Sequence, residues 1–137
     1  MKKRGQASVE YLILVGVMLA FLIPLFYYAL TEISSNLKTS QAENAISMLA
    51  GKIDNVYSLG PGNREKVKIT IPKGTVSLDI LENKTVELKL LVYGNVTEIF
   101  KTTKAQNIIT NPLKDPGTYF LIIESLDNGD IKIDVKK

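Results

Sequence analysis

The pattern of apolar and polar residues along the chain changes twice. It begins with an uncharged, strongly apolar run from Tyr11 to Thr31. As an α-helix these 21 residues would span about 30 Å, which matches the hydrocarbon thickness of a bilayer. The run therefore predicts a helix that crosses a membrane.

After Thr31, apolar residues recur mostly at intervals of three and four among polar and charged ones. This spacing is typical of an amphipathic helix with one apolar stripe. The cluster Gly60-Pro61-Gly62-Asn63 is a strong stop signal for that helix. We expect one long helix over residues 6–58, with an apolar half at 9–31 and an amphipathic half at 32–58. The expected stripe consists of Leu30, Ile33, Leu37, Ala42, Ala45, Ile46, Leu49, Ile53 and Val56.

From residue 64 onward the apolar positions alternate with polar ones, which is the period of a half-buried β-strand. Turn-forming residues separate six such segments, and the longest irregular stretch runs from Thr102 to Gly117. The expected strands cover residues 66–71, 75–80, 86–92, 96–101, 118–124 and 131–135. The fold class is therefore α+β: a long N-terminal helix packed on a small antiparallel sheet or sandwich of about six strands, with a β-rich head domain at 64–137.

Composition removes several classes of chemistry. The chain has no cysteine and no histidine, so it lacks thiol nucleophiles, thiolate metal sites and the commonest general base. No cluster of carboxylates, serines or lysines suggests a catalytic, metal or cofactor site. We therefore expect a protein that is not an enzyme.

The positive charge is concentrated at the N-terminus. The net charge is +3, and without Lys2, Lys3 and Arg4 the remaining 14 basic and 14 acidic residues balance. A nucleic-acid partner would need a basic face on the folded domain, so none is expected. We expect Lys66 and Lys68 to lie on a solvated strand face.

The basic residues also orient the apolar run. Positive charge directly before a membrane span predicts that the N-terminus stays in the cytoplasm and the head domain lies outside. A conventional secretory signal peptide is the alternative. The apolar run is long for one, and no small-x-small cleavage site follows it.

The residues around the start of the run form a specific motif. A short basic segment ends at Gly5, and Gln6, Ser8, Glu10 and Leu14 follow at fixed spacing. This sequence resembles the type IV prepilin family, and in particular the archaeal class III signal peptide group, whose pattern is Gln-x-Ser-x-Glu-x-x-x-Leu. The resemblance is specific over residues 2–30, and the β-rich domain carries no family motif.

The resemblance implies a structural pilin subunit of an archaeal type IV-like pilus. A prepilin peptidase would remove residues 1–5 by cutting between Gly5 and Gln6, and the apolar helix would be retained. The precursor would lie in the cytoplasmic membrane and the product in an extracellular adhesion filament, a helical homo-oligomer. The implied partners are the peptidase, an assembly ATPase and a membrane platform protein. A single-pass membrane-anchored extracellular binding protein that does not polymerise remains the alternative.

The resemblance also gives Glu10 a role. In a filament core, Glu10 of one subunit would pair with the Gln6 amine of a neighbour and set the axial register. Cyclisation of Gln6 to pyroglutamate would remove that amine. Alternatively, Glu10 is an interfacial acid stabilised by the helix dipole.

Three further residues within the apolar run point to helix packing. Gly16 and Ala20 form a small-xxx-small pair that permits close helix approach, and Pro24 should bend or loosen the helix. Ordinary transmembrane tolerance explains all three equally well.

Two sequons lie at expected turns on the outward side. They are Asn83-Lys84-Thr85 and Asn95-Val96-Thr97, and neither has a central proline. Asn83 and Asn95 are therefore candidate N-glycosylation sites, or simply polar turn residues.

Overall fold

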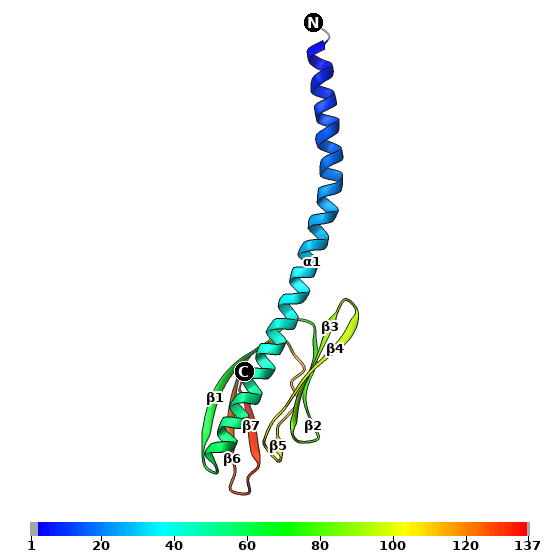
Figure 1. The fold of residues 1–137 in the computed structure, drawn as a ribbon. Helices are drawn as coiled ribbons and strands as arrows, with labels where there is room; N and C mark the ends of the chain where they lie inside the picture. The colour runs from blue at the N-terminus through cyan, green and yellow to red at the C-terminus, as the bar shows by residue number, and fades with distance from the viewer. Residues whose placement is uncertain (1–2, 137) are drawn as a thin grey trace. The chain divides into compact units, whose positions relative to one another are not determined.

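The computed structural model describes the backbone of residues 3–136 and the side chains of residues 8–136. The chain divides into two compact units, Met1–Asn36 and Leu37–Lys137. Within the described residues, one helix, α1 (Lys3–Leu59), is followed by seven strands. The strands are β1 (Arg64–Ile71), β2 (Thr75–Leu81), β3 (Thr85–Val92), β4 (Asn95–Thr102), β5 (Ile108–Ile109), β6 (Gly117–Ser125) and β7 (Ile131–Lys136) (Figure 1). The expected α+β class is confirmed.

The strands form two sheets rather than one. A four-stranded sheet has the order β1-β6-β7-β5, and a three-stranded sheet has the order β2-β3-β4. All six expected strands are present, and each of their ends lies within two residues of the expected position. The strand β5 is additional. It is a two-residue strand within the stretch expected to be irregular, and it runs parallel to β7, so the first sheet is mixed. Two residues are too few to establish an alternating pattern, which is why the sequence gives no sign of β5.

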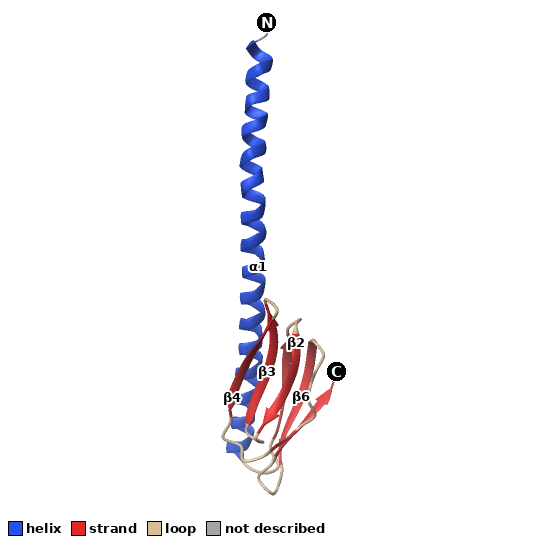
Figure 2. Ribbon diagram, turned by 90° about the vertical axis from the view of Figure 1, so that its right-hand side faces the viewer, coloured by secondary structure: helices blue, strands red, loops and turns tan. Residues whose placement is uncertain are grey.

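The C-terminal turns of α1 supply one wall of the head's core. Figure 2 shows these turns against the strand layer, and the buried helix residues belong to the same apolar cluster as the strands. The helix members are Ala42, Ile46, Leu49, Ile53 and Val56, and the largest strand members are Ile69, Leu88, Leu90, Leu121, Ile123 and Ile131. The amphipathic stripe therefore packs on the sheets as expected.

The stripe is shorter than expected at its N-terminal end. Leu30, Ile33 and Leu37 are exposed, and Ala42 is the first fully buried residue among the described side chains of α1. A helical period identifies a face but carries no information on how far the opposing sheet extends. The expected packing of the amphipathic half on the sheets is thus present, and its fully buried residues begin at Ala42.

Two polar contacts fix the helix to the head. The side chain of Lys52 forms an ion pair with Glu65 of β1. The backbone N–H of Lys104 donates a 2.7 Å hydrogen bond to the Asp54 carboxylate. After Leu59 the chain turns at Gly60, which has a φ of +85°. Such a left-handed residue commonly ends a helix. The Asn63 side-chain amide donates to the Leu59 carbonyl and so satisfies one of the unpaired groups at the helix end.

The packing of α1 gives a direct test of the core. Ile53 is fully buried, whereas Met48 on the same helix is about half exposed. We predict that Ile53→Ala lowers the free energy of unfolding by about 2–5 kcal/mol through the cavity it leaves. Met48→Ala, the control, should cost less than about 1 kcal/mol. Chemical denaturation of the chain in mild detergent, followed by circular dichroism, would compare them, and equal effects would contradict this core.

Candidate membrane-spanning and assembly segment

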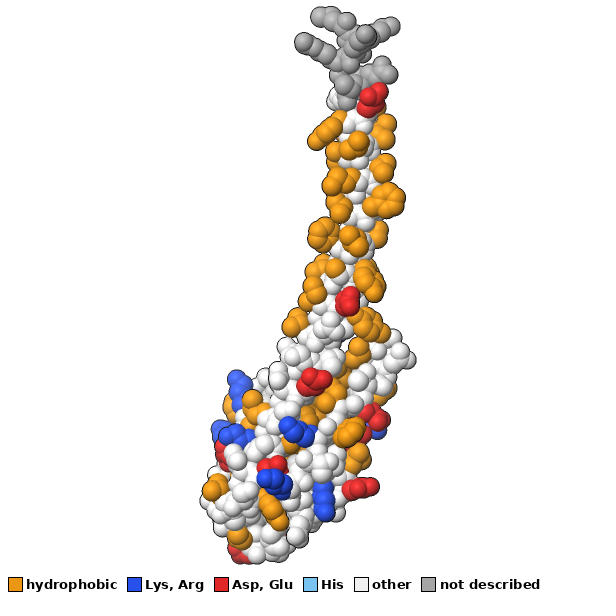
Figure 3. Space-filling view, in the orientation of Figure 1, with side chains coloured by type: hydrophobic (Ala, Val, Ile, Leu, Met, Phe, Trp, Pro, Cys, Tyr) orange, Lys and Arg blue, Asp and Glu red, His pale blue; other side chains and the backbone are white. Residues whose placement is uncertain are grey.

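The apolar segment of α1, Val9–Thr31, exposes its side chains to every side. The most apolar stretch of 18 residues contains no buried residue. Figure 3 shows apolar side chains along the whole visible face of this segment. Its exposed large side chains are Val9, Tyr11, Leu12, Ile13, Leu14, Val15, Val17, Met18, Leu19, Phe21, Ile23, Leu25, Phe26, Tyr27, Tyr28 and Leu30.

This exposure distinguishes the segment from the core helix of a soluble domain. A core helix of similar composition would be mostly buried, and a helix that is apolar all round needs a nonpolar surrounding. The segment is long and apolar enough to cross a membrane. A long N-terminal helix compatible with membrane anchoring is therefore present.

The residues of the N-terminal motif lie in the first turns of α1. Ser8, Glu10 and Leu14 are exposed, and Glu10 and Leu14 are one turn apart on the same helix face. The backbone of Gly5 and Gln6 lies within α1, whereas the side chains of Lys3, Arg4 and Gln6 lie outside the described residues, as does all of Lys2.

The proposed scissile bond lies where a helix is weakest. The first four N–H groups of a helix have no intrahelical acceptor, and the bond between Gly5 and Gln6 lies in the first turn of α1. Helix ends fray by one or two residues. Unwinding the chain between Gly5 and Gln6 into a protease-accessible form would therefore break few hydrogen bonds, and α1 would begin at Gln6 after a cut.

Gly16, Ala20 and Pro24 follow one another at spacings of four, so they lie near one another on one face of α1. A Cβ placed on Gly16 would meet nothing within 4 Å, so no contact within this chain requires a glycine. Glycine in a helix costs about 1 kcal/mol relative to alanine. The α-helix continues through Pro24, which has no N–H to donate to the Ala20 carbonyl.

At the other end of the segment, a polar side chain is satisfied internally. The Thr31 hydroxyl donates a 2.9 Å hydrogen bond to the Tyr27 carbonyl. Internal satisfaction of this kind lets a hydroxyl lie at the edge of an apolar surrounding.

Both sequon asparagines are exposed in the head. Asn83 lies in the turn between β2 and β3 with a φ of 58°, and its carbonyl accepts the Ile108 N–H at 2.9 Å. Asn95 is the first residue of β4, directly after a glycine turn. Neither side chain is buried, so both are sterically accessible to a modifying enzyme.

The head also carries a basic and aromatic cluster that the sequence did not reveal. The Lys66 and Lys68 ammonium groups lie 4.7 and 5.9 Å from the centroid of the Phe120 ring, within the range of a cation–π contact. Lys66 and Lys68 come from β1, and Phe120 comes from β6, about fifty residues later. Only the β1–β6 register brings them together, so local sequence patterns contain no signal for this cluster.

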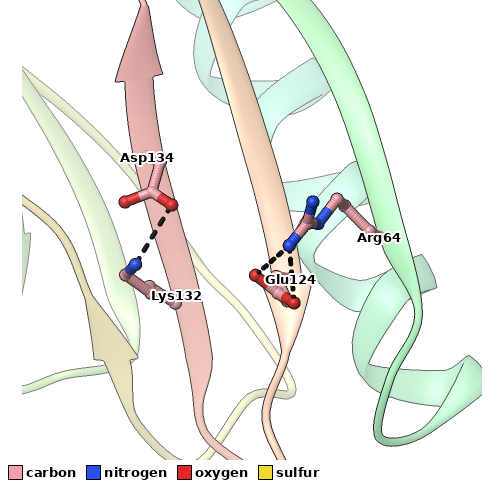
Figure 4. A network of polar contacts seen from close by, with 4 residues as sticks. All are labelled: Arg64, Glu124, Lys132 and Asp134. Carbon is pink, nitrogen blue, oxygen red and sulfur yellow. Dashed lines mark hydrogen bonds and ion pairs between the residues drawn. The ribbon is translucent and has the colours of Figure 1, made fainter.

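Ion pairs flank this cluster on the same sheet. Figure 4 shows Arg64 of β1 with both carboxylate oxygens of Glu124 of β6, each at 2.9 Å. It also shows Lys132 and Asp134 on β7, whose side chains meet at 3.1 Å. These exposed pairs contribute little to stability, but within each pair the two opposite charges cancel.

A second charged cluster lies on the three-stranded sheet. Lys89 of β3 lies 3.2 Å from Glu98 of β4 and 3.6 Å from Glu87. The hydrogen bond to Glu98, assisted by the negative charge of Glu87, raises the pKa of Lys89 above its usual range. Lys89 therefore stays charged at any physiological pH. Among residues with described side chains, no group of His, Cys, Asp and Glu has the arrangement of a metal site.

Comparison of the chain with protein-family models, curated proteins and solved structures found no match.

The exposed apolar segment predicts a strong effect of a central charge. We predict that Phe21→Arg reduces stable membrane insertion, because an arginine at mid-bilayer depth costs about 2.5–3.5 kcal/mol on insertion scales. Leu59→Arg, at the exposed C-terminal end of α1, is the matched control and should insert normally. Alkaline extraction of membranes would measure the retained fraction. Equal retention of both variants would contradict a membrane span at Val9–Thr31.

Proposed function

We propose that this protein is a prepilin-like structural subunit. It inserts in the cytoplasmic membrane through Val9–Thr31, is cut between Gly5 and Gln6, and assembles through the same segment into an extracellular filament. The observation that carries the proposal is the exposure of apolar side chains on every side of this segment, directly after the Gln6-x-Ser8-x-Glu10-x-x-x-Leu14 motif.

The membrane step follows from the charges around the segment. Three basic residues precede it, and the remainder of the chain is formally neutral. Positive charge is retained on the cytoplasmic side, so the head is translocated. The head then folds around its own core, which draws on α1 only from Ala42 onward.

The assembly step exchanges lipid contacts for helix contacts. Lipid tails are as apolar as leucine, so the hydrophobic effect adds little when helices associate within a bilayer. The favourable free energy of association must therefore come from close packing. The exposed face of Gly16 and Ala20 is suited to close packing because both residues are small. Because Pro24 donates no hydrogen bond to the Ala20 carbonyl, the helix bends more easily at this point, where neighbouring helices would contact it.

Glu10 adds a specific interaction to this packing. A lone carboxylate within lipid raises the free energy of the membrane-bound subunit, and this cost favours its transfer into the filament. Cleavage before Gln6 would create a new amine four residues from Glu10. The amine of one subunit would pair with Glu10 of the next, and this pairing would fix the axial stagger of adjacent subunits.

The machinery that this function requires is a prepilin peptidase, an assembly ATPase and a membrane platform protein. The assembled filament would display the heads outward for adhesion. We propose Asn83 and Asn95 as glycan acceptors, because both are exposed in the head, which would lie outside the membrane.

Mass spectrometry of the purified protein tests the processing step. We predict a mature N-terminus at Gln6 in protein recovered by shearing cells, and the same intact masses would report glycans on Asn83 and Asn95. Gly5→Leu should block processing, because a bulky side chain replaces the small residue before the cut. Intact Met1 in a detergent-soluble monomer, with nothing in the sheared fraction, would instead support a membrane-anchored binding protein.

Glu10→Ala separates assembly from processing. We predict that this variant is still cut after Gly5 but yields at least about tenfold less filament, since breaking a buried charge pair costs about 3–5 kcal/mol. Glu32→Ala is the matched control, because Glu32 is an exposed carboxylate just beyond the apolar run. Electron microscopy and quantification of sheared material would measure the yield. Normal filament yield from Glu10→Ala would remove Glu10 from the mechanism.

A further inference from the structure

Although the charges beyond the N-terminal basic residues balance overall, the outer surface of the four-stranded sheet is a basic face. Strand register places residues of β1, β6 and β7 in three rows across it, and residues opposite one another share a face. The rows are Arg64–Glu124–Lys132, Lys66–Ile122–Asp134 and Lys68–Phe120–Lys136. Five basic and two acidic residues give this face a net charge of +3.

The positive charge is concentrated around one aromatic ring. Glu124 and Asp134 are engaged by Arg64 and Lys132, as described above. Among the residues with described side chains, Lys66, Lys68 and Lys136 have no carboxylate within ion-pair distance. Lys66 and Lys68 contact Phe120, which is 39% exposed, and Lys136 lies opposite Phe120 on β7.

The outer surface of the three-stranded sheet is an acidic, apolar face. Its register places the rows Asp79–Glu87–Phe100, Ser77–Lys89–Glu98 and Leu81–Thr85–Thr102 side by side, with the pair Leu91–Val96 beyond them. Three acids and one base give it a formal net charge of −2, and because Glu87 is buried and paired with Lys89, the accessible acids are Asp79 and Glu98. Its exposed apolar side chains are Leu81, Leu91, Val96 and Phe100, and Phe100 is 69% exposed.

We propose that the acidic face of one copy of this protein docks on the basic face of a second copy. The two faces carry opposite net charge, and each exposes an aromatic side chain, Phe120 on one and Phe100 on the other. Sheets pack face to face at about 10 Å with interdigitating side chains. Association would therefore bury the apolar side chains of both faces and give Lys66 and Lys68 carboxylate partners such as Glu98 and Asp79.

A second copy suits these faces better than a soluble polyanion does. A polyanion would satisfy the lysines of the basic face but would leave Leu91, Val96 and Phe100 exposed. A contact between two different faces is heterologous, so each copy retains one free face for the next copy. Such a contact forms a ring if its rotation closes and an open helical assembly if it does not, and a filament requires the open form. The proposal thus rests on the proposed function and names a head-to-head contact within the filament.

Charge reversal tests the contact with the full-length chain. The basic-face variant is Lys66→Glu with Lys68→Glu, and the acidic-face variant is Asp79→Lys with Glu98→Lys. Lys101→Glu with Lys104→Glu is the matched control, because both lysines are exposed and lie outside the two faces. A zero-length carbodiimide cross-linker applied to an equal mixture of ¹⁴N- and ¹⁵N-labelled chains would identify links between copies.

We expect Lys66 or Lys68 to cross-link with Glu98 or Asp79 of another copy in the wild-type filament and in the control. Reversal of the acidic face removes the carboxylates that these links require, so filament yield is the readout for that variant, and we expect it to fall at least about tenfold. The basic-face variant alone should likewise lose links between its faces, because both are then acidic. A mixture of the two variants should restore assembly and inter-copy links, since each reversed face then meets an opposite charge.

Several results would overturn the contact. Filaments with no cross-link between these faces would reject it while leaving the proposed function intact. Links in concentrated detergent-solubilised chain, but no filaments, would retain the contact and reject the function, and an absence of links in both samples would reject the contact. Protection of Lys66 and Lys68 by a soluble sulfated polysaccharide, with inter-copy links unchanged by either variant, would favour a polyanion.

Thermal unfolding of each variant would report whether its head remains folded. If Glu98→Lys disrupts the Lys89 cluster, Phe100→Ser replaces it. Phe100 is highly exposed, and this change keeps every charge while removing apolar contact area. It should reduce the inter-copy links of the folded protein by at least about tenfold, and unchanged links would contradict the proposal.

Discussion

The structure depends on keeping one apolar helix segment out of water. Fully burying a large apolar side chain is worth about 1.5–3 kcal/mol, and Val9–Thr31 exposes such side chains on every face. A single exposed patch on a soluble monomer rarely exceeds a few hundred Å². The segment therefore needs a continuous apolar surrounding along its length. Lipid provides one, other copies of the same helix provide another, and the proposed function is a transfer from the first to the second.

The head makes such a transfer feasible because its stability does not draw on that segment. Among the described side chains of α1, those in its core run from Ala42 to Tyr57, and both sheets supply most of the rest. The contacts of Lys52 with Glu65 and of Asp54 with Lys104 tie this part of the helix to the head. One continuous helix thus belongs to two compact units, so a change in the surroundings of Val9–Thr31 need not disturb the core of the head.

Local periodicity was sufficient to predict most of the fold. The apolar run, the helical stripe and six alternating segments each follow from short-range spacing, and so does the end of α1 near Gly60. The sequence could not show which strands are neighbours. The expectation that Lys66 and Lys68 lie on a solvated face is confirmed, since both are exposed, but the Phe120 ring that β6 places beside them was not foreseen. The motif from Gln6 to Leu14 shows the opposite case, since its identification rests on sequence alone and the described side chains add only the exposure of Ser8, Glu10 and Leu14.

The central claim is that copies of the apolar segment cover one another outside the membrane. The chain contains no cysteine, so single cysteines can be introduced at successive positions from Tyr11 to Thr31 without a background of native thiols. Oxidative cross-linking of protein sheared from cells measures the claim most directly. We predict disulfide-linked dimers with a helical periodicity, strongest on the face of Gly16 and Ala20. Protein that remains wholly in the membrane fraction, with no dimer at any position, would contradict it.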